Sequence, residues 1–510
     1  MNRRRFLQLA GLVAGSAALA ACDNVNPLGQ PIARAREYAA GLPFALPSLP
    51  LGEGLGMRDG FTALARLTFG PRVEERQRAA EIGLPAWLEE QLAPEQIEDE
   101  GVRLLLGRFD TLNMHAHELH AWSDKLFDDE DRATVPDELR QATLLRQIYS
   151  RRQLYEVMVD FWTDHFNISV EKGDCFYLKT VDDRDVIRPH ALGNFRDLLW
   201  ASAHSPAMLV YLDQHVSDKT HPNENYAREI MELHTLGVEG GYSQQDVMEL
   251  ARCFTGWTVK EHWWRGEFAF DPAKHDDGPK TVLGMKLEPS GQAEAEAVIE
   301  KLATHPSTAR FIAGKLARRF LGENASPEII QRAAETFLQT NGEIRAVLRV
   351  IVLEGLLKFP AGEKIERRFK RPVHFITSAL RQLNAATNSG LALHEYLARM
   401  GQRHFHWPTP DGYPDRDEAW LGNLQPRWQF ALTLAHNEIE GTHLDLDGLL
   451  TALNAHTPEE ITDGLAVLLL GQPLPTTERN ALLNALKGAD DELPRVLVAG
   501  LIASPAFQWR

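Results

Sequence analysis

The chain has 510 residues, of which 71 are acidic and 54 are Lys or Arg, so its formal net charge is −17. An acidic protein is repelled by nucleic acid, which excludes nucleic-acid binding as a working hypothesis. Three cysteines are too few for a disulfide scaffold, and beyond residue 21 no segment approaches the roughly 18 consecutive apolar residues of a membrane-spanning helix.

The first residues have the organisation of an export signal. Arginines at positions 3–5 precede an apolar stretch over residues 10–21, as in twin-arginine signals, and the small residues before Cys22 resemble a lipobox. We expect residues 1–21 to be removed, which changes the formal net charge from −17 to −20 because three arginines are lost. A lipid on Cys22 would then be the only contact with the membrane. Asp23 resembles an inner-membrane retention signal, so the expected location is the periplasmic face of the inner membrane.

The remaining chain divides into a tether and a helical body. Residues 22–57 are rich in Pro and Gly without hydrophobic periodicity, which predicts a flexible tether. From residue 58 to 510 apolar residues recur at helical spacing, which predicts an all-α fold built as one large multi-helix domain, or as two with a boundary near 385–440. One stretch, 257–284, predicts a short β-hairpin arm. The clearest expected helices are 144–168, 205–213, 224–236, 244–255, 306–321, 342–355, 372–384 and most of 424–503.

Helix ends are well marked in the middle of the chain. Ser205 before Pro206 predicts a helix start with a capping hydroxyl and proline at the first helical position. The helix that begins near Asn223 is expected to stop at Gly237 in a left-handed conformation. Ser243, as the first residue of an S-x-x-D capping box, predicts the start of the next helix.

The helix predicted over 224–236 has one polar face. Asn225, Arg228, Glu229 and Glu232 fall within an arc of roughly 100°. This face is either solvated, with Arg228 and Glu232 as an i,i+4 ion pair, or it lines a cleft. In a cleft the two carboxylates would raise one another's pKa and act as general acid and base, or bind a divalent cation together with Asn225.

Two further residues could support this face. His165 shares an apolar stripe with Leu154, Met158 and Phe161, which predicts either a buried core histidine or a proton-transfer group or ligand that faces the 224–236 helix. Asp213 lies near the end of its helix, where the helix dipole is unfavourable for a carboxylate. This position predicts a specific partner, such as Arg228 or a metal.

Four other features each allow two interpretations. The histidines within 115–120 form a metal site or are incidental. The aromatic, proline-rich loop 404–414 stacks on sugar rings or packs over a helix end. The basic run 364–371 receives an anionic substrate or partner, or is a solvated helix face. Cys175 and Cys253 form a disulfide or are two buried small hydrophobes.

The sequence resembles the bacterial family catalogued as "domain of unknown function 1800". The resemblance runs from about Leu64 to the C-terminus, and the run Asn223–Glu229 is its most distinctive part. It implies a large, mostly helical exported protein, often encoded beside a second exported protein, and it implies no reaction. The segments that carry it are Phe161–Phe166, His190–Phe195, Pro206–Asp213, Asn223–Gly237, Ala251–Trp257, His275–Lys280 and His305–Arg310.

These observations predict an exported lipoprotein that acts as a cell-envelope hydrolase or lyase, with or without a divalent metal. The alternative is a non-catalytic scaffold or maturation factor for an exported partner protein. The two hypotheses differ in what the carboxylates face, which is a cleft for the enzyme and open solvent for the scaffold. The expected catalytic residues are Glu229, Glu232, Arg228, Asn225, His165 and Asp213.

Overall fold

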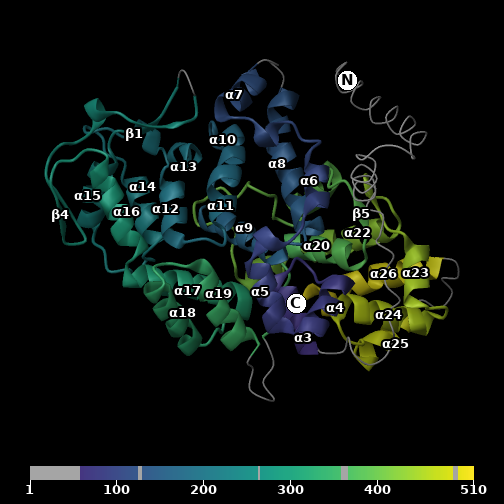
Figure 1. Cartoon of the computed structure of the whole chain (residues 1–510). Helices are drawn as coiled ribbons and strands as arrows, with labels where there is room; N and C mark the ends of the chain where they lie inside the picture. The colour runs from purple at the N-terminus through teal and green to yellow at the C-terminus, as the bar shows by residue number, and fades with distance from the viewer. Residues whose placement is uncertain (1–57, 125–128, 262–264, 358–365, 486–491) are drawn as a thin grey trace, which may run out of the picture.

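A computed structural model describes residues 58–124, 129–261, 265–357, 366–485 and 492–510 (Figure 1). The export signal expected over 1–21, the tether over 22–57 and Lys364 of the basic run lie outside these residues. The described residues are mostly helical, with three two-stranded sheets, so the all-α prediction is confirmed. None of their helices combines the length and the apolar character that crossing a membrane requires.

The helices follow one another along the chain with short connections. The first half contains α3 (Arg58–Leu67), α4 (Val73–Ile82), α5 (Leu84–Leu92), α6 (Glu100–Leu106), α7 (Ala116–Asp124), α8 (Asp129–Tyr149), α9 (Gln153–His165), α10 (Cys175–Asp182), α11 (Arg188–His190), α12 (Phe195–Ala203), α13 (Pro206–Tyr211), α14 (Glu224–Glu232) and α15 (Gln244–Phe254). The second half contains α16 (Ala293–Ala303), α17 (Pro306–Leu321), α18 (Pro327–Gln339), α19 (Ile344–Val350), α20 (Pro372–Gln382), α21 (Leu391–Arg399), α22 (Leu424–Ala435), α23 (Leu446–Leu453), α24 (Pro458–Leu470), α25 (Thr476–Ala485) and α26 (Leu493–Ala503).

The strands form three antiparallel pairs. β1 (Trp257–Val259) pairs with β2 (Phe268–Phe270), which is the predicted hairpin. β3 (Lys280–Val282) and β4 (Met285–Leu287) form a second hairpin, so the stretch 257–284 contributes to two hairpins where one was expected. The third pair joins β5 (Ala386–Thr387) to β6 (Thr442–His443).

One hydrophobic core extends from Ala63 to Phe507, and α20 is buried along its whole length within it. In Figure 1, α12 to α16 and the strands β1 and β4 lie on one side, α22 to α26 lie on the opposite side, and α8, α9 and α20 lie between them.

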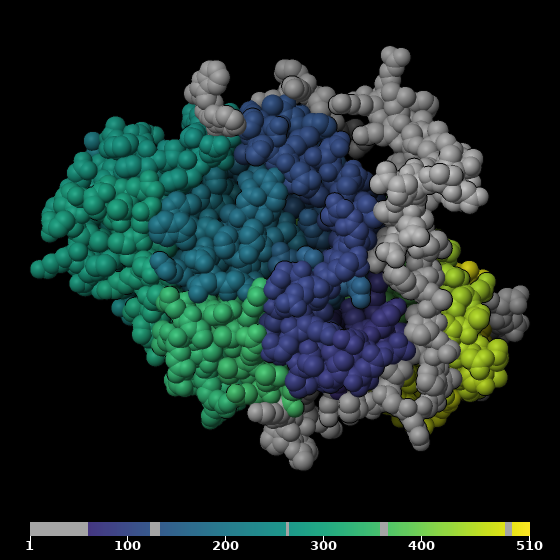
Figure 2. Space-filling view, in the orientation of Figure 1, coloured from purple at the N-terminus to yellow at the C-terminus, as the bar shows by residue number. Residues whose placement is uncertain are grey.

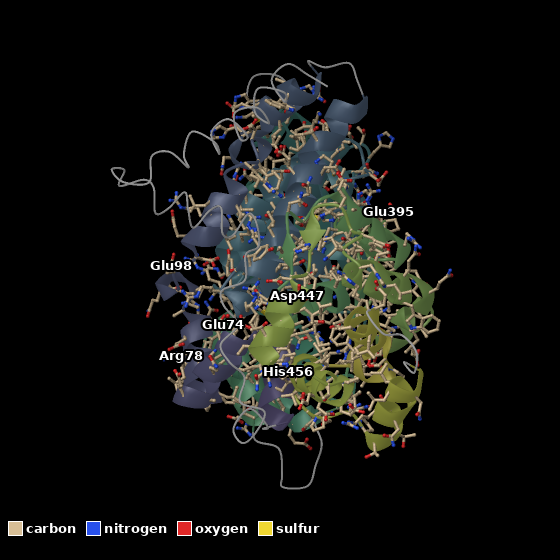
Figure 3. All side chains as sticks on the ribbon, turned by 90° about the vertical axis from the view of Figure 1, so that its right-hand side faces the viewer. Glu74, Arg78, Glu98, Glu395, Asp447 and His456 are labelled. Carbon is tan, nitrogen blue, oxygen red and sulfur yellow. The ribbon has the colours of Figure 1, made fainter. Side chains whose placement is uncertain are left out.

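Helices from distant parts of the chain pack against each other. Figure 2 shows the green residues of α19 directly beside the purple residues of α5, where Arg349 binds Glu89 at 2.9 Å. On the side shown in Figure 3, Glu74 and Arg78 project from α4, and Asp447 and His456 project from the C-terminal elements. The chain therefore closes on itself and brings its N-terminal and C-terminal helices into one body.

The helix expected over 144–168 is two helices, because the chain breaks at Ser150–Arg152. Asp99 accepts hydrogen bonds from the Ser150 hydroxyl at 2.7 Å and from the Arg151 N–H at 2.9 Å, so a distant carboxylate satisfies the groups at the break. α13 begins at Pro206 as expected, but the Ser205 hydroxyl donates to Asp182 at 2.7 Å and does not cap the helix.

The basic run before α20 is not a solvated helix face. Arg368, Lys370 and Arg371 are buried in an extended segment. Arg368 binds Asp417 at 2.9 Å and Arg371 binds Asp164 at 2.6 Å. Carboxylates far away in the sequence therefore provide the counter-charges that make this burial tolerable.

Both described cysteines, Cys175 and Cys253, are free and buried, so the hydrophobic interpretation holds and the disulfide does not form. Burial raises the pKa of the Cys253 thiol to about 12, and the pKa of Cys175 is raised for the same reason. Neither is a reactive thiolate at neutral pH.

Candidate functional site

A pocket of about 390 Å³ lies against the polar face of α14. Two residues of α14 line it, together with the end of α13 and two loops that approach from other parts of the chain. The lining residues are Ser169, Glu171, Lys172, Tyr211, Leu212, Asp213, Asn225, Glu229, Pro408 and Pro410. The pocket therefore contains three of the six expected catalytic residues: Asn225, Glu229 and Asp213.

The start of α14 is fixed by Asn223. Its side-chain oxygen accepts a hydrogen bond from the Asn225 N–H at 2.8 Å, and its amide donates to the Leu212 carbonyl at 2.8 Å. The first contact caps the helix, and the second ties it to the end of α13. Because Tyr226 and Ile230 are buried on the opposite face, Asn225 and Glu229 are turned toward the pocket, as the periodicity predicted.

α14 ends at Glu232, four residues before the expected end. The last turn widens, because the His234 N–H donates to the Glu229 carbonyl at 3.1 Å and the Leu236 N–H to the Met231 carbonyl at 2.7 Å. Gly237 follows with φ of 81°, the left-handed conformation expected for it.

Glu229 is half-buried, and within the described part of the chain its carboxylate accepts no hydrogen bond. Burial raises its pKa, the charge of Glu232 raises it further, and Arg228 partly opposes this shift. Asp411, from the loop on the other side of the pocket, also raises it. A carboxyl group held in this way can carry a proton closer to neutral pH than an ordinary glutamate.

Asp213 has a different partner from the ones expected. Lys172 binds its carboxylate at 2.8 Å, and the contact involves neither Arg228 nor a cluster of metal ligands. Asp213 has φ of 57°, a left-handed conformation that Asp tolerates, and it closes the end of α13. Three carboxylates therefore line the pocket: Asp213 is paired with Lys172, Glu171 lies 2.7 Å from the His406 Nδ1, and Glu229 has a raised pKa.

Arg228 and Glu232 do not form the ion pair that their spacing allows. Arg228 binds Glu224 at 3.6 Å and donates to Gln244 at 3.0 Å, whereas Glu232 accepts a hydrogen bond from the Tyr242 hydroxyl at 3.2 Å. Gln244 is the first residue of α15 and Tyr242 lies just before it, so the start of α15 packs along α14. Neither Arg228 nor Glu232 lines the pocket, so both act on it through Glu229.

His165 lies beneath the site and does not line the pocket. Its Nδ1 lies 2.9 Å from the Lys315 ammonium, and its Nε2 lies 3.1 Å from the His234 carbonyl. These contacts assign a neutral ring that accepts from Lys315 and donates to His234. Burial, together with Lys315, lowers the pKa of His165 well below its usual value. His165 is thus a core histidine that anchors the chain after α14.

The loop 407–412 forms the opposite wall of the pocket. The Tyr211 hydroxyl donates to the Pro408 carbonyl at 2.9 Å, and the Asn167 amide donates to the Thr409 carbonyl at 2.7 Å. Gly412 has φ of 74°, and a Cβ placed on it would lie 2.0 Å from the Asp164 carbonyl oxygen. The close approach fixes the loop on the end of α9. Sequence spacing could not have found Tyr211, because nothing local links it to Pro408.

The aromatic residues of this loop serve packing. Tyr413 is buried, and the Trp407 ring lies 4.9 Å from it. Tyr413 is therefore a core residue that packs with Phe369 and Trp420, while the exposed Pro408 lines the pocket. In the histidine-rich segment, the rings of His115 and His117 stack at 5.8 Å. Within the described residues, no group of three or more His, Cys, Asp or Glu side chains is arranged to hold a metal ion.

A family model described as "Protein of unknown function (DUF1800)" matches residues 62–509. The chain belongs to the DUF1800 family. No curated protein and no solved structure matches it.

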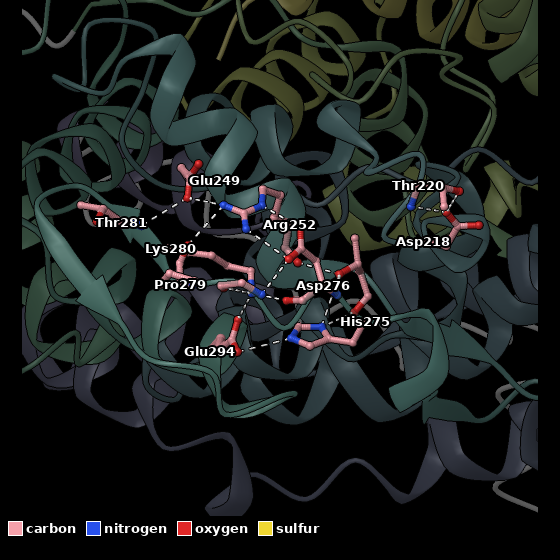
Figure 4. Close-up of polar contacts among 12 residues, drawn as sticks. Asp218, Thr220, Glu249, Arg252, His275, Asp276, Pro279, Lys280, Thr281 and Glu294 are labelled. Carbon is pink, nitrogen blue, oxygen red and sulfur yellow. Dashed lines mark hydrogen bonds and ion pairs between the residues drawn. The ribbon is translucent and has the colours of Figure 1, made fainter.

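Two of the segments by which the chain resembles DUF1800 proteins lie in different structural settings. Asn223–Glu229 forms the pocket wall, whereas His275–Lys280 lies in a closed ion network beside β3 (Figure 4). There Glu294 of α16 binds Lys280 at 2.5 Å and His275 at 3.3 Å. Arg252 of α15 binds Asp276 at 2.7 Å. This network joins the β3–β4 hairpin to α15 and α16.

Proposed function

We propose that this protein is a cell-envelope hydrolase or lyase in which Glu229 is the general acid. The proposal rests on the environment of the Glu229 carboxyl group. It is half-buried in a pocket, it has no hydrogen-bond partner among the described residues, and its pKa is raised. Asp213 in the same pocket forms an ion pair with Lys172 at 2.8 Å. A carboxyl group whose surroundings raise its pKa, beside a carboxylate held by a lysine, is the arrangement that acid–base cleavage needs.

In a hydrolysis, Glu229 would donate its proton to the leaving oxygen as the scissile C–O bond breaks. Asp213 would accept a proton from the attacking water, whose oxygen forms the new bond to carbon. Asn225 lines the same pocket and would hold a substrate hydroxyl group. An open pocket with this mixture of donors and acceptors suits a glycan or another polar envelope polymer. In a form that uses a divalent cation, Asn225 and Glu229 would supply ligands from α14.

The proposed location follows from residues 1–22. The arginines at positions 3–5, the apolar stretch and Cys22 support twin-arginine export and a lipid anchor. Cys22→Ser should release an exported protein from the membrane, because the lipid is proposed as its only attachment. Arg4→Lys combined with Arg5→Lys should leave a cytoplasmic precursor. A Cys22→Ser protein that stays membrane-bound after a high-salt wash would refute the single anchor.

The activity test uses purified peptidoglycan and purified envelope polysaccharide, with released fragments measured by mass spectrometry. The wild-type protein should release fragments from one of them, and Glu229→Gln should lower the rate about 100-fold or more. Glu239→Gln, an exposed glutamate just beyond α14, is the matched control and should keep the activity.

The acid–base form predicts that protein treated with EDTA keeps its rate. A loss restored by one divalent cation would replace it with the metal form. If Glu229→Gln cleaves as fast as the wild type, Glu229 is not the acid. If neither polymer is cleaved, and Glu229→Gln still replaces the wild type in cells that lack the protein, the scaffold hypothesis takes its place.

A further inference from the structure

A second cavity lies between α3, α20, the end of α24 and the C-terminal segment. Its volume is about 60 Å³, roughly four times the space that one water molecule needs. It shares no lining residue with the pocket on α14. The polar residues that line it include Lys370, His374, Gln382 and Arg510.

The side chains that line the cavity are cationic or neutral. Lys370, His374 and Arg510 are 5%, 2% and 9% exposed, so each is at least nine-tenths buried. The described residues around the cavity include no Asp or Glu side chain. The charged groups that act on Lys370 are Arg510 and Arg427, which are both cations. Burial and this repulsion lower the pKa of Lys370 well below its usual value.

Several of these polar atoms lack partners within the described part of the chain. Both ring nitrogens of His374 and the Nε of Arg510 are buried without a hydrogen bond. The Lys370 ammonium lies over the Phe507 ring, 3.2 Å from its centroid, and has no hydrogen-bonding partner there.

The neighbouring buried cations are different, because Arg368 and Arg371 each bind an aspartate. Buried donors normally have a hydrogen-bond partner, so the orphaned nitrogens of His374 and Arg510 indicate that the cavity holds a group with acceptor oxygens.

We propose that this cavity binds a small inorganic oxyanion of the phosphate class. A bound anion would favour the protonated form of Lys370, and His374 and Arg510 would donate hydrogen bonds to separate oxygens. His374 is the third residue of α20, so the positive end of that helix dipole adds to the attraction. The bound anion would join α20 to α3 and the C-terminal segment and would thereby stabilise the fold, independently of the chemistry at Glu229.

The experiment measures thermal unfolding of the full chain carrying Cys22→Ser, with inorganic phosphate added at constant ionic strength set by sodium chloride. The wild-type cavity should give a saturable rise in Tm, since a ligand that binds only the folded state stabilises it. Lys370→Met should abolish the saturable rise. Lys286→Met, which changes an exposed lysine on β4, should keep it.

A Tm that does not respond to phosphate, or that responds equally in Lys370→Met, would overturn the proposal and leave the cavity to water. If Lys370→Met does not fold, equilibrium dialysis of the Cys22→Ser chain against radiolabelled phosphate decides the question. One phosphate bound per chain, reduced at least tenfold in His374→Phe, supports the site. No bound phosphate, or equal binding in that variant, contradicts it.

Discussion

The pocket on α14 and the ion network beside β3 both contain a glutamate, but the two glutamates differ in their partners and in the direction of their pKa shifts. Glu294 is 1% exposed and binds both Lys280 and His275. Burial alone would raise its pKa, but the hydrogen bonds from Lys280, the Ser290 N–H and His275 hold that pKa below its usual value. Glu229 is less buried, has no such donors, and has a raised pKa. A carboxylate that is fully paired holds elements together, whereas one that is buried without partners is available for proton transfer.

The largest expected effect is the loss of stability when Glu294, the paired glutamate, is replaced. Glu294→Gln leaves the fully buried Lys280 ammonium without its counter-charge and should lower the free energy of unfolding by about 3–5 kcal/mol. Glu229→Gln should change it by less than about 1 kcal/mol. Denaturant unfolding measures both, with Glu335→Gln on the exposed face of α18 as the control. Equal losses for Glu294→Gln and Glu229→Gln would remove the contrast.

The next effect concerns the wall of the pocket. Gly412→Ala should lower the free energy of unfolding by about 1–3 kcal/mol, because its Cβ would collide with the Asp164 carbonyl oxygen. The loop 407–412 should move away from α9, and the cleavage rate should fall with it. Gly422→Ala has no atom within 4 Å of its added Cβ and should leave both quantities unchanged. Wild-type activity in Gly412→Ala would show that the pocket does not depend on this wall.

The third effect is the acid dependence of the network. A hydrogen bond from Arg252 lowers the pKa of Asp276 to about 2, and the pKa of Glu294 is also lowered. The stability that each provides is complete above its unfolded-state pKa, near about 4, and is lost as pH falls through the folded-state pKa. The free energy of unfolding should therefore decrease from about pH 5 toward pH 2, with a shallower decrease in Asp276→Asn. Equal slopes in both proteins would contradict the role of the Arg252–Asp276 pair.

The smallest effect is on the tuning of Glu229. Glu232→Gln removes one of the charges that raise the pKa of Glu229. Because the general acid must be protonated, the alkaline limb of the rate–pH profile should move to lower pH. The maximum rate should change little, since Glu232 does not line the pocket. A loss of rate at every pH would mean that Glu232 contacts the substrate.

Local patterns predicted much of this molecule. Periodicity separated the two faces of α14, and the capping box at Ser243 marks the start of α15 as expected, with its hydroxyl accepting from the Asp246 N–H at 3.2 Å. The predictions that were wrong concern contacts between residues that are distant in the sequence. Asp213 binds Lys172, and Arg371 is buried because Asp164 neutralises it. The spacing of residues along the sequence does not predict such pairs.

The same limit applies to the site. Asn225 and Glu229 could be predicted as one polar face, because they belong to one helix. Pro408 and Tyr211 could not be assigned to the pocket, because the hydrogen bond between them joins residues 197 positions apart. Whether Glu229 faced a cleft or open solvent therefore depended on a loop from another part of the chain.

The most direct test of the central claim is the pKa of the Glu229 carboxyl group. It can be followed by NMR titration of protein labelled with carbon-13 at the glutamate side-chain carboxyl, with the signal assigned by its absence in Glu229→Gln. If Glu229 is the general acid, its pKa should lie above the roughly 4.3 of an ordinary glutamate. The Glu232→Gln substitution should lower that pKa. A pKa at or below the ordinary value would show an ionised surface carboxylate, and the proposed role of Glu229 as the acid would be wrong.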